Sequence, residues 1–208
     1  MSMDKSQLIA WLEKLNTVYA DKKEYLTDLD AAIGDADHGI NMNRGFKKVM
    51  EKLPTVKEED IGTILKTVGM TLMSSVGGAS GPLYGSFWMK GGMLLVGKEE
   101  LETDDFVRFI QAGVEGIQSR GRPEKGDKTM YDLWVPVLEK MEEEAAAGSE
   151  LTSMIETILP VAEKALADTI PLQARKGRAS YLGERSIGHQ DPGATSSFYI
   201  LETLQQVL

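Results

Sequence analysis

Apolar residues recur at intervals of three and four positions along most of the chain, whereas strict alternation of apolar and polar residues is almost absent. Such spacing gathers apolar side chains on one face of an α-helix, so we predict an all-α fold. Pro136 and Pro160 fall inside two of the apolar stripes and are expected to kink or interrupt those helices. The clearest stripes comprise Leu8, Trp11, Leu12, Leu15 and Tyr19; Ile61, Ile64, Leu65, Val68, Leu72 and Val76; Phe106, Phe109, Ile110 and Ile117; Leu133, Val137, Leu138 and Met141; and Leu151, Met154, Ile155, Ile158 and Leu166.

Several predicted helices begin at residues that favour helix N-termini. Asp4 and Gln7 have the spacing of a capping box, in which each side chain accepts a backbone N–H of the other residue. Thr103 is predicted to cap the helix that follows it, because its hydroxyl can accept a free N–H of the first turn. Asp191 is a natural N-cap for the last helix, and Pro192 suits the first helical position.

The connections between the predicted helices are of two kinds, which alternate along the chain. Short charged connections lie near residues 53–60, 98–103 and 148–150, and glycine-rich connections lie at 34–39, 77–82, 120–129 and 170–193. If consecutive helices run up and down, every second connection lies at the same end of the bundle. Glycine allows backbone N–H groups to approach an anion closely, so this pattern predicts a phosphate-binding end. Alternatively, each glycine simply terminates a helix.

The composition narrows the classes of protein to which the chain can belong. At 208 residues it can bury a core as one domain, or as two small ones. A formal net charge of -9 argues against direct binding to nucleic acid or to anionic membranes. The absence of cysteine excludes disulfides, a thiolate nucleophile and sulfur-rich metal sites. With no apparent signal sequence or membrane span, we expect a cytoplasmic protein.

The segment from residue 28 to residue 41 concentrates acidic side chains beside glycines. Asp30, Asp35 and Asp37 lie within eight positions of one another. Three converging carboxylates repel each other, so they either point into water or share a divalent cation. Mg²⁺ prefers oxygen ligands and often shares its coordination sphere with substrate phosphates. We therefore predict that these three aspartates bind Mg²⁺.

Other metals fit this segment less well. A calcium-binding EF-hand loop opened by Asp35 would need glycine at its sixth position and glutamate at its twelfth, but Ile40 and Phe46 stand there. Zinc sites draw on cysteine and clustered histidine, and the chain has only His38 and His189. His38 is then either a surface imidazole or, beside a metal, a hydrogen-bond partner for a phosphate oxygen.

Two further loops have the chemistry of anion sites. Residues 76–82 offer successive backbone N–H groups and the Ser80 hydroxyl, although they lack the lysine and following serine or threonine of a P-loop. Residues 173–193 concentrate positive charge in an otherwise acidic chain, so they could close over phosphates as a lid. Alternatively, they form a mobile basic loop that docks on a partner. The basic residues are Arg175, Lys176, Arg178 and Arg185.

Four motifs together resemble those of a known family. They occupy residues 34–39, 77–82, 126–130 and 175–193. Their order and spacing are similar to those of the DhaL family, the nucleotide-binding subunits of bacterial dihydroxyacetone kinases, over essentially the whole chain. The resemblance implies one domain over residues 1–208. It also implies an up-and-down antiparallel barrel or bundle of about eight amphipathic helices, with the nucleotide site at one end.

The resemblance further implies roles for individual residues. Asp30, Asp35 and Asp37 would hold two Mg²⁺ ions that bridge the phosphates of ADP or ATP, and together with His38 and Arg178 they would form the catalytic set. The nucleotide contacts would come from residues in or near the four motifs. They are His38, Gly39, Ile40, Asn41, Ala79, Ser80, Gly121, Met130, Arg178, Asp191, Pro192 and Gly193.

The activity implied by the resemblance is phosphoryl transfer to dihydroxyacetone. In the family a separate DhaK subunit holds the ketone through a histidine, and in the phosphotransferase-system version phospho-DhaM rephosphorylates bound ADP in place. Fused members instead use free ATP. Two other classes stay open, namely a binding module that docks on a transcriptional regulator and the nucleotide domain of a fatty-acid kinase.

Overall fold

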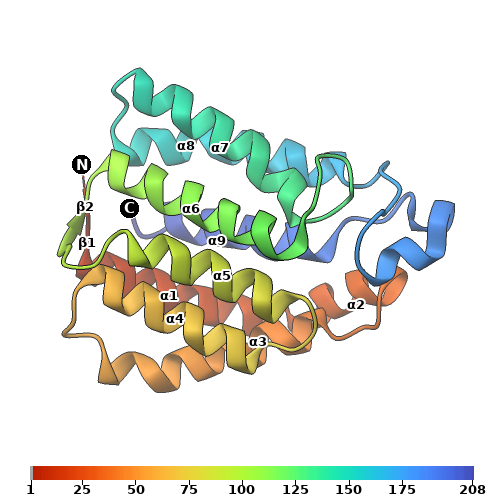
Figure 1. The fold of residues 1–208 in the computed structure, drawn as a ribbon, viewed down its shortest axis with the longest axis horizontal. Coiled ribbons are helices and arrows are strands. Elements are labelled where there is room, and N and C mark those ends of the chain that lie inside the picture. The colour runs from red at the N-terminus through yellow and green to blue at the C-terminus, as the bar shows by residue number, and fades with distance from the viewer. Residues whose placement is uncertain (1) are drawn as a thin grey trace.

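The computed structural model describes residues 2–208, and within them it is almost entirely helical (Figure 1), which confirms the predicted all-α class. Two short 3₁₀ helices and a two-stranded antiparallel sheet complete the described chain. The elements are β1 Met3–Asp4, α1 Lys5–Asp21, α2 Lys23–Ile33, α3 His38–Lys52, η1 Leu53–Thr55, α4 Ile61–Ser75, α5 Ser80–Met93, β2 Glu100–Leu101, α6 Thr103–Gly121, α7 Met130–Ala146, α8 Leu151–Asp168, η2 Arg178–Ser186 and α9 Pro192–Gln205.

Successive helices pack side by side and run up and down in turn. Because α9 packs against α1, the ring of helices is closed (Figure 1). Helices α1 and α2 form one nearly continuous helical rod, because only Lys22 separates them. The helical hydrogen bonds continue through this residue: its N–H donates to the Val18 carbonyl at 2.8 Å, and its carbonyl accepts from the Leu26 N–H at 2.9 Å. If α1 and α2 are counted as one, residues 2–208 form eight helical rods, the number expected.

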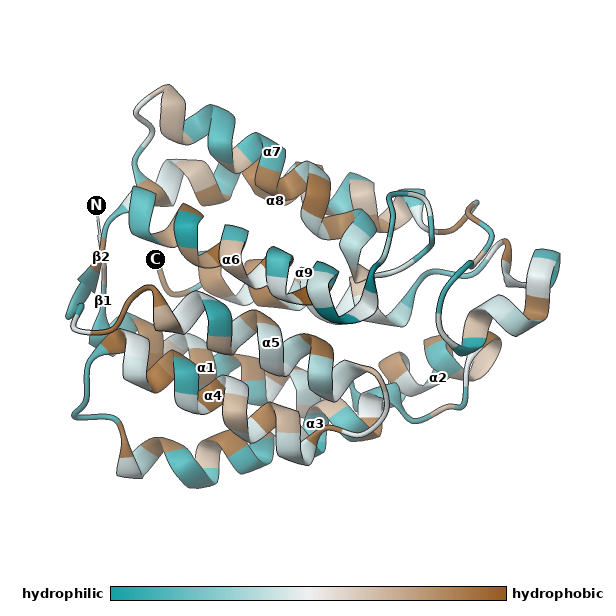
Figure 2. Ribbon diagram, in the orientation of Figure 1, coloured by the Kyte–Doolittle hydropathy of each residue, from teal (hydrophilic) through white to brown (hydrophobic). Residues whose placement is uncertain are grey.

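Aromatic side chains fill the interior of the barrel. The rings of Trp11 and Trp88 are 5.2 Å apart, and those of Phe87 and Trp134 are 4.9 Å apart. All four side chains are fully buried, and each contributes on the order of 2–3 kcal/mol of apolar transfer free energy. Figure 2 shows the corresponding pattern, in which brown apolar positions recur along the helices between teal polar ones. The helical stripes of the sequence therefore form one continuous core.

The predicted caps at the two ends of the chain are confirmed. The Asp4 carboxylate accepts the Gln7 backbone N–H at 2.8 Å, while the Gln7 side chain accepts the Asp4 N–H at 3.0 Å. At the other end, Asp191 accepts the Ala194 N–H at 2.7 Å, and Pro192 begins α9. Both caps satisfy N–H groups that a helix cannot pair internally.

The predicted cap of α6 was wrong, and of the two effects expected of the internal prolines, interruption of the helix does not occur. Helix α6 is capped by Glu102 rather than by Thr103, because Glu102 is still extended while Thr103 already has helical geometry, and the Asp105 side chain accepts the Glu102 N–H at 3.3 Å. Pro136 and Pro160 do not interrupt their helices, since α7 and α8 continue through them. Burial of the apolar faces of these helices outweighs the one hydrogen bond that each proline removes.

The barrel has two different ends. The strand pair β1–β2 and both chain termini lie at one end, whereas α2 and the loop before α9 project at the other (Figure 1). None of the helices in residues 2–208 has the length and hydropathy needed to span a membrane.

Candidate functional site

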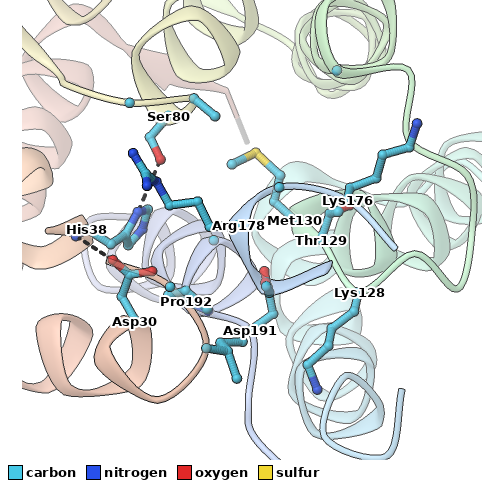
Figure 3. Close-up of a pocket in the computed structure, with 18 of the residues that line it drawn as sticks. Asp30, His38, Ser80, Lys128, Thr129, Met130, Lys176, Arg178, Asp191 and Pro192 are labelled. Carbon is cyan, nitrogen blue, oxygen red and sulfur yellow. Dashed lines mark hydrogen bonds between the residues drawn. The ribbon is translucent and has the colours of Figure 1, made fainter. Parts of the chain in front are cut away.

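A cavity of about 650 Å³ opens at the end of the barrel where the glycine-rich connections meet (Figure 3). All four of these connections contribute to its lining, so the prediction that alternate loops share one end is confirmed. The lining residues include Gly34, Asp35 and Asp37; Gly77, Gly78, Ala79 and Ser80; Gly121, Pro123, Lys128 and Thr129; and Arg175 to Tyr181 with Asp191, Pro192 and Gly193.

Three aspartates converge on one side of this cavity. Oxygens of Asp30, Asp35 and Asp37 lie within 4.8 Å of one another. The buried Asp30 lies near the end of α2, and its Oδ2 accepts the backbone N–H groups of Asp37 at 2.9 Å and of His38 at 3.1 Å. Asp37, at the N-cap position of α3, makes no capping bond with its own side chain. Hard carboxylate oxygens at this separation fit Mg²⁺.

The backbone between these aspartates explains how they come together. Ala36 has a left-handed conformation with φ of 60°, which an L-residue adopts only at some cost. This turn lies between Asp35 and Asp37 and reverses the chain within a few residues. As a result, carboxylates from the end of one helix and the start of the next meet at one point.

His38 is buried, so the alternative of a surface imidazole was wrong. Its Nε2 lies 2.8 Å from the Ser196 hydroxyl and its Nδ1 lies 3.1 Å from the Ser80 hydroxyl. Burial lowers the pKa of His38 to about 4, against the opposing effect of the nearby Asp30 and Asp37 charges. The ring is therefore neutral near pH 7 and links the N-terminal parts of α3, α5 and α9. Its predicted contact with a phosphate stays a prediction.

The hydrogen-bonded cluster around His38 extends into the barrel. The Tyr84 hydroxyl lies 2.6 Å from the Ser196 hydroxyl and 2.9 Å from that of Ser197. Sequence reasoning did not single out these three residues, which are buried polar groups outside the four motifs. Together they fix the ends of α5 and α9 beside the turn that carries the aspartates.

Three residues predicted to contact nucleotide do not line the cavity, namely Gly39, Ile40 and Asn41. A Cβ atom on Gly39 would lie 1.9 Å from the Lys23 carbonyl oxygen, so this glycine is needed for the packing of α3 on α2. Ile40 is 49% exposed, and the Asn41 side chain accepts a hydrogen bond from Arg44 at 2.7 Å. Their contacts with a nucleotide stay predictions.

The long connection before α9 covers one side of the cavity. We call residues 170–191 the strap; it contains η2. Arg178 on the strap donates from Nε to Asp35 Oδ2 at 2.8 Å, so it lies directly beside the acidic cluster. Arg175 and Lys176 also border the cavity, whereas Arg185 is outside it. Residues 175–181 of the strap therefore border the cavity, as a lid over phosphates requires.

Another part of the cavity lining is apolar. Leu83, Ile117, Pro123 and Met130 border it together with Gly121. Apolar side chains and a glycine that leaves space for a flat ring suit a nucleobase, whereas the glycine loop at residues 77–81 and the carboxylates suit phosphates and a metal. The cavity thus has one apolar part and one polar part.

The fold and the site together define an all-α phosphotransferase domain. A model of the DAK2 domain family matches residues 32–206. The chain is 50% identical over 204 residues to the ADP-binding subunit DhaL of the PEP-dependent dihydroxyacetone kinase of Escherichia coli (strain K12), covering 98% of this chain and 97% of that one. It is 46% identical over 200 residues to the corresponding PTS-dependent subunit of Lactococcus lactis, covering 96% of each chain. The chain therefore belongs to the DAK2 family and, within it, to the DhaL group.

Solved structures support the same fold. The native dihydroxyacetone kinase of C. freundii superposes with a TM-score of 0.73 and 21% sequence identity, covering 96% of this chain and 34% of that one. The complex of that kinase with AMP-PNP and Mg²⁺ gives a TM-score of 0.72 at 19% identity, covering 99% of this chain and again 34% of the kinase. This chain thus corresponds to about a third of that larger kinase.

Asp191 should make stability depend on pH. Burial raises its pKa from 3.8 to about 7, so between these values the folded state holds a proton that the unfolded state has lost. The contribution of Asp191 to the free energy of unfolding therefore falls as the pH rises from about 4 to about 7.

Asp191→Asn keeps an oxygen that can cap α9 but removes the group that titrates. In metal-free protein, we expect its free energy of unfolding relative to wild type to rise over this range, by at most about 4 kcal/mol. Denaturant titrations at several pH values test this, and a difference independent of pH would contradict it.

Proposed function

We propose that this protein transfers a phosphoryl group from a Mg²⁺-bound adenine nucleotide to dihydroxyacetone held on a separate DhaK subunit, giving dihydroxyacetone phosphate. The observation that carries the proposal is the meeting, at one cavity, of three aspartates within 4.8 Å, a glycine loop and Arg178. The name of the E. coli relative, an ADP-binding subunit of a dihydroxyacetone kinase, supports it. We take the chain to act as a single domain in the cytoplasm.

Each part of the site has a physical task in this reaction. Asp30, Asp35 and Asp37 would hold two Mg²⁺ ions, which neutralise charge on the phosphates when bound. The backbone of residues 77–81 and the Ser80 hydroxyl would donate hydrogen bonds to phosphate oxygens. Arg178, already beside Asp35, would stabilise charge that develops on the transferred group. Catalysis would then consist of positioning and electrostatics, without a covalent protein intermediate.

The remaining predicted contacts would place the rest of the nucleotide. Gly121 and Met130 border the apolar part of the cavity and would receive the adenine and ribose. Ala79 would border the phosphates, and the turn at Asp191, Pro192 and Gly193 would close the pocket from the start of α9.

We further propose that bound ADP is a cofactor, rephosphorylated in place by phospho-DhaM. The names of the E. coli and L. lactis relatives, PEP-dependent and PTS-dependent, support this source of phosphate.

A test combines the purified chain with DhaK, dihydroxyacetone and either phospho-DhaM or free ATP. Dihydroxyacetone phosphate formed with phospho-DhaM and catalytic ADP supports the proposal. Product from free ATP alone would indicate an exchanging nucleotide, and no product from either donor would indicate a module that only binds a regulator.

Native mass spectrometry of the chain tests the cofactor directly. A retained mass equal to ADP with Mg²⁺ is expected, because a cofactor that is rephosphorylated in place has no need to leave. A chain that carries no nucleotide after purification and binds ATP reversibly would contradict this part of the proposal. The number of Mg²⁺ ions follows from the same spectrum.

Replacing Arg178 by alanine should slow phosphoryl transfer roughly a hundredfold, because one charge-stabilising donor of the transition state is lost. The melting temperature should change little, since the side chain is largely exposed and its ion pair with Asp35 is at the surface. Arg185→Ala is the matched control, because Arg185 lies on the same strap but does not border the cavity. An unchanged turnover of Arg178→Ala together with a lowered melting temperature would show a structural role instead.

A further inference from the structure

Lys128 is a lysine whose ammonium group is buried beneath the strap. Only 2% of the residue is exposed. Its Nζ donates hydrogen bonds to three backbone carbonyls, those of Thr169 at 2.8 Å, Leu172 at 3.0 Å and Ile170 at 3.2 Å. Buried lysine is rare because removing an ammonium group from water is costly unless its donors are satisfied. Here each of the three donors has an acceptor.

The three carbonyls belong to residues 169–172, at the start of the strap; we call this segment the neck of the strap, because the two ends of the strap meet there. The Gly188 N–H donates to the Ile170 carbonyl at 2.8 Å, and the Asp191 N–H donates to the Thr169 hydroxyl at 3.1 Å. Residues close to the C-terminal end of the strap are therefore hydrogen-bonded to Thr169 and Ile170, two of the three residues that Lys128 binds. In addition, these carbonyls follow the C-terminus of α8, where a positive charge is favourable.

The segment that carries Lys128 also binds the strap through a backbone hydrogen bond. The Arg175 N–H donates to the Asp127 carbonyl at 3.0 Å. Three residues further along the strap, Arg178 pairs with Asp35 of the acidic cluster. A continuous set of contacts thus runs from the loop between α6 and α7, through the strap, to the carboxylates.

Lys128 itself points away from the polar part of the cavity. In Figure 3 its side chain is directed away from the group formed by His38, Ser80 and Arg178. Its ammonium group is satisfied by the strap carbonyls. A direct contact with phosphate would require breaking these bonds. Lys128 therefore differs from a phosphate-binding lysine, whose ammonium group is available to the ligand.

We propose that Lys128 is a positioning residue: it fixes the neck of the strap so that Arg178 stays beside the acidic cluster, and it thereby slows nucleotide release and supports transfer. The effect on transfer rests on the proposed function, whereas the effect on the strap does not. Lysine suits this task because one flexible side chain supplies three donors to carbonyls that no single neutral side chain could satisfy.

The first experiment measures the strap directly. Hydrogen exchange of wild type, Lys128→Met and Lys164→Met is compared in protein without metal or nucleotide. Lys164→Met is the matched control, because Lys164 lies near the end of α8, the helix that leads into the strap, but is paired with Asp168 at the surface. We expect amides of the strap to exchange at least about tenfold faster in Lys128→Met alone, while those of α4 and α5 are unchanged. Unchanged strap exchange would overturn the proposal, and if Lys128→Met does not fold, Lys128→Gln takes its place.

The second experiment separates positioning from a general structural role. A double-mutant cycle compares Lys128→Met, Arg178→Ala and the double variant in the phosphoryl-transfer assay, with release of Mg²⁺–ADP measured in parallel. If Lys128 acts through Arg178, Lys128→Met slows transfer by about tenfold in the wild-type background but has little further effect once Arg178 is absent. Independent, multiplicative effects would overturn this route. If no variant or wild type transfers phosphate, the proposed function fails, while the hydrogen-exchange result still decides the role of Lys128 in the strap.

Discussion

Asparagine in place of Asp35 or Asp37 is expected to abolish retention of the Mg²⁺–nucleotide complex and leave the helical fold intact. The three carboxylates lie within 4.8 Å of one another, so each substitution removes a charged ligand from the same small site. Neutral amide oxygens bind Mg²⁺ much more weakly than carboxylates, and the affinity should fall by at least about a hundredfold. The core is untouched because Asp35 is exposed and Asp37 only half-buried. Calorimetric titration with ADP and Mg²⁺, alongside circular dichroism, measures both quantities.

Asp28→Asn is the matched control for these substitutions. Asp28 is an exposed aspartate on α2, two residues before Asp30, and it does not border the cavity. The Asp28→Asn variant should bind Mg²⁺–ADP as wild type does, which separates loss of a ligand from loss of general negative charge. Full ADP binding by Asp35→Asn in the presence of EDTA would show that the nucleotide is held without a metal bridge.

The sequence predicts features that depend on neighbouring residues. The helical stripes indicate the all-α fold because each apolar face is set within one helix. The acidic cluster is predictable for a similar reason, since Asp35 and Asp37 lie in one turn and Asp30 lies at the end of the preceding helix. The common end of the glycine-rich loops follows from the alternation of helix direction alone. None of these inferences requires knowledge of contacts between distant segments.

Other features depend on residues that meet only in the folded chain. His38 lies between the hydroxyls of Ser80 and Ser196, and Ser196 is 158 positions away in sequence. Lys128 binds carbonyls at least 41 positions away, and nothing in a lysine within a glycine-rich loop predicts its burial. The prediction of Thr103 as a cap was wrong, because the choice between adjacent N-cap residues depends on which backbone N–H the Asp105 side chain accepts. It accepts that of Glu102. Such details follow from packing rather than from local pattern.

Gly34→Ala should damage the metal site although residue 34 carries no ligand. A Cβ atom there would lie 2.1 Å from Asp30 Oδ1 and 3.0 Å from the Asp30 carbonyl oxygen. The Asp30 carboxylate would have to rotate, but its other oxygen holds the Asp37 and His38 N–H groups, which would lose their acceptor. We expect the affinity for Mg²⁺–ADP, measured by calorimetric titration, to fall at least about tenfold, because one ligand is displaced and the start of α3 is loosened.

Gly148→Ala separates this effect from simple loss of stability. Gly148 lies between α7 and α8, outside the cavity, with φ of 78°, and a Cβ atom there would have no neighbour within 4 Å. Alanine at this position is strained by its backbone conformation and should cost about 1 kcal/mol of stability. Nucleotide binding should nevertheless stay at the wild-type level. If Gly34→Ala and Gly148→Ala bound Mg²⁺–ADP equally well, the space that glycine leaves at residue 34 would not be needed to place the Asp30 carboxylate. The assignment of Asp30 as a fixed Mg²⁺ ligand would then be wrong.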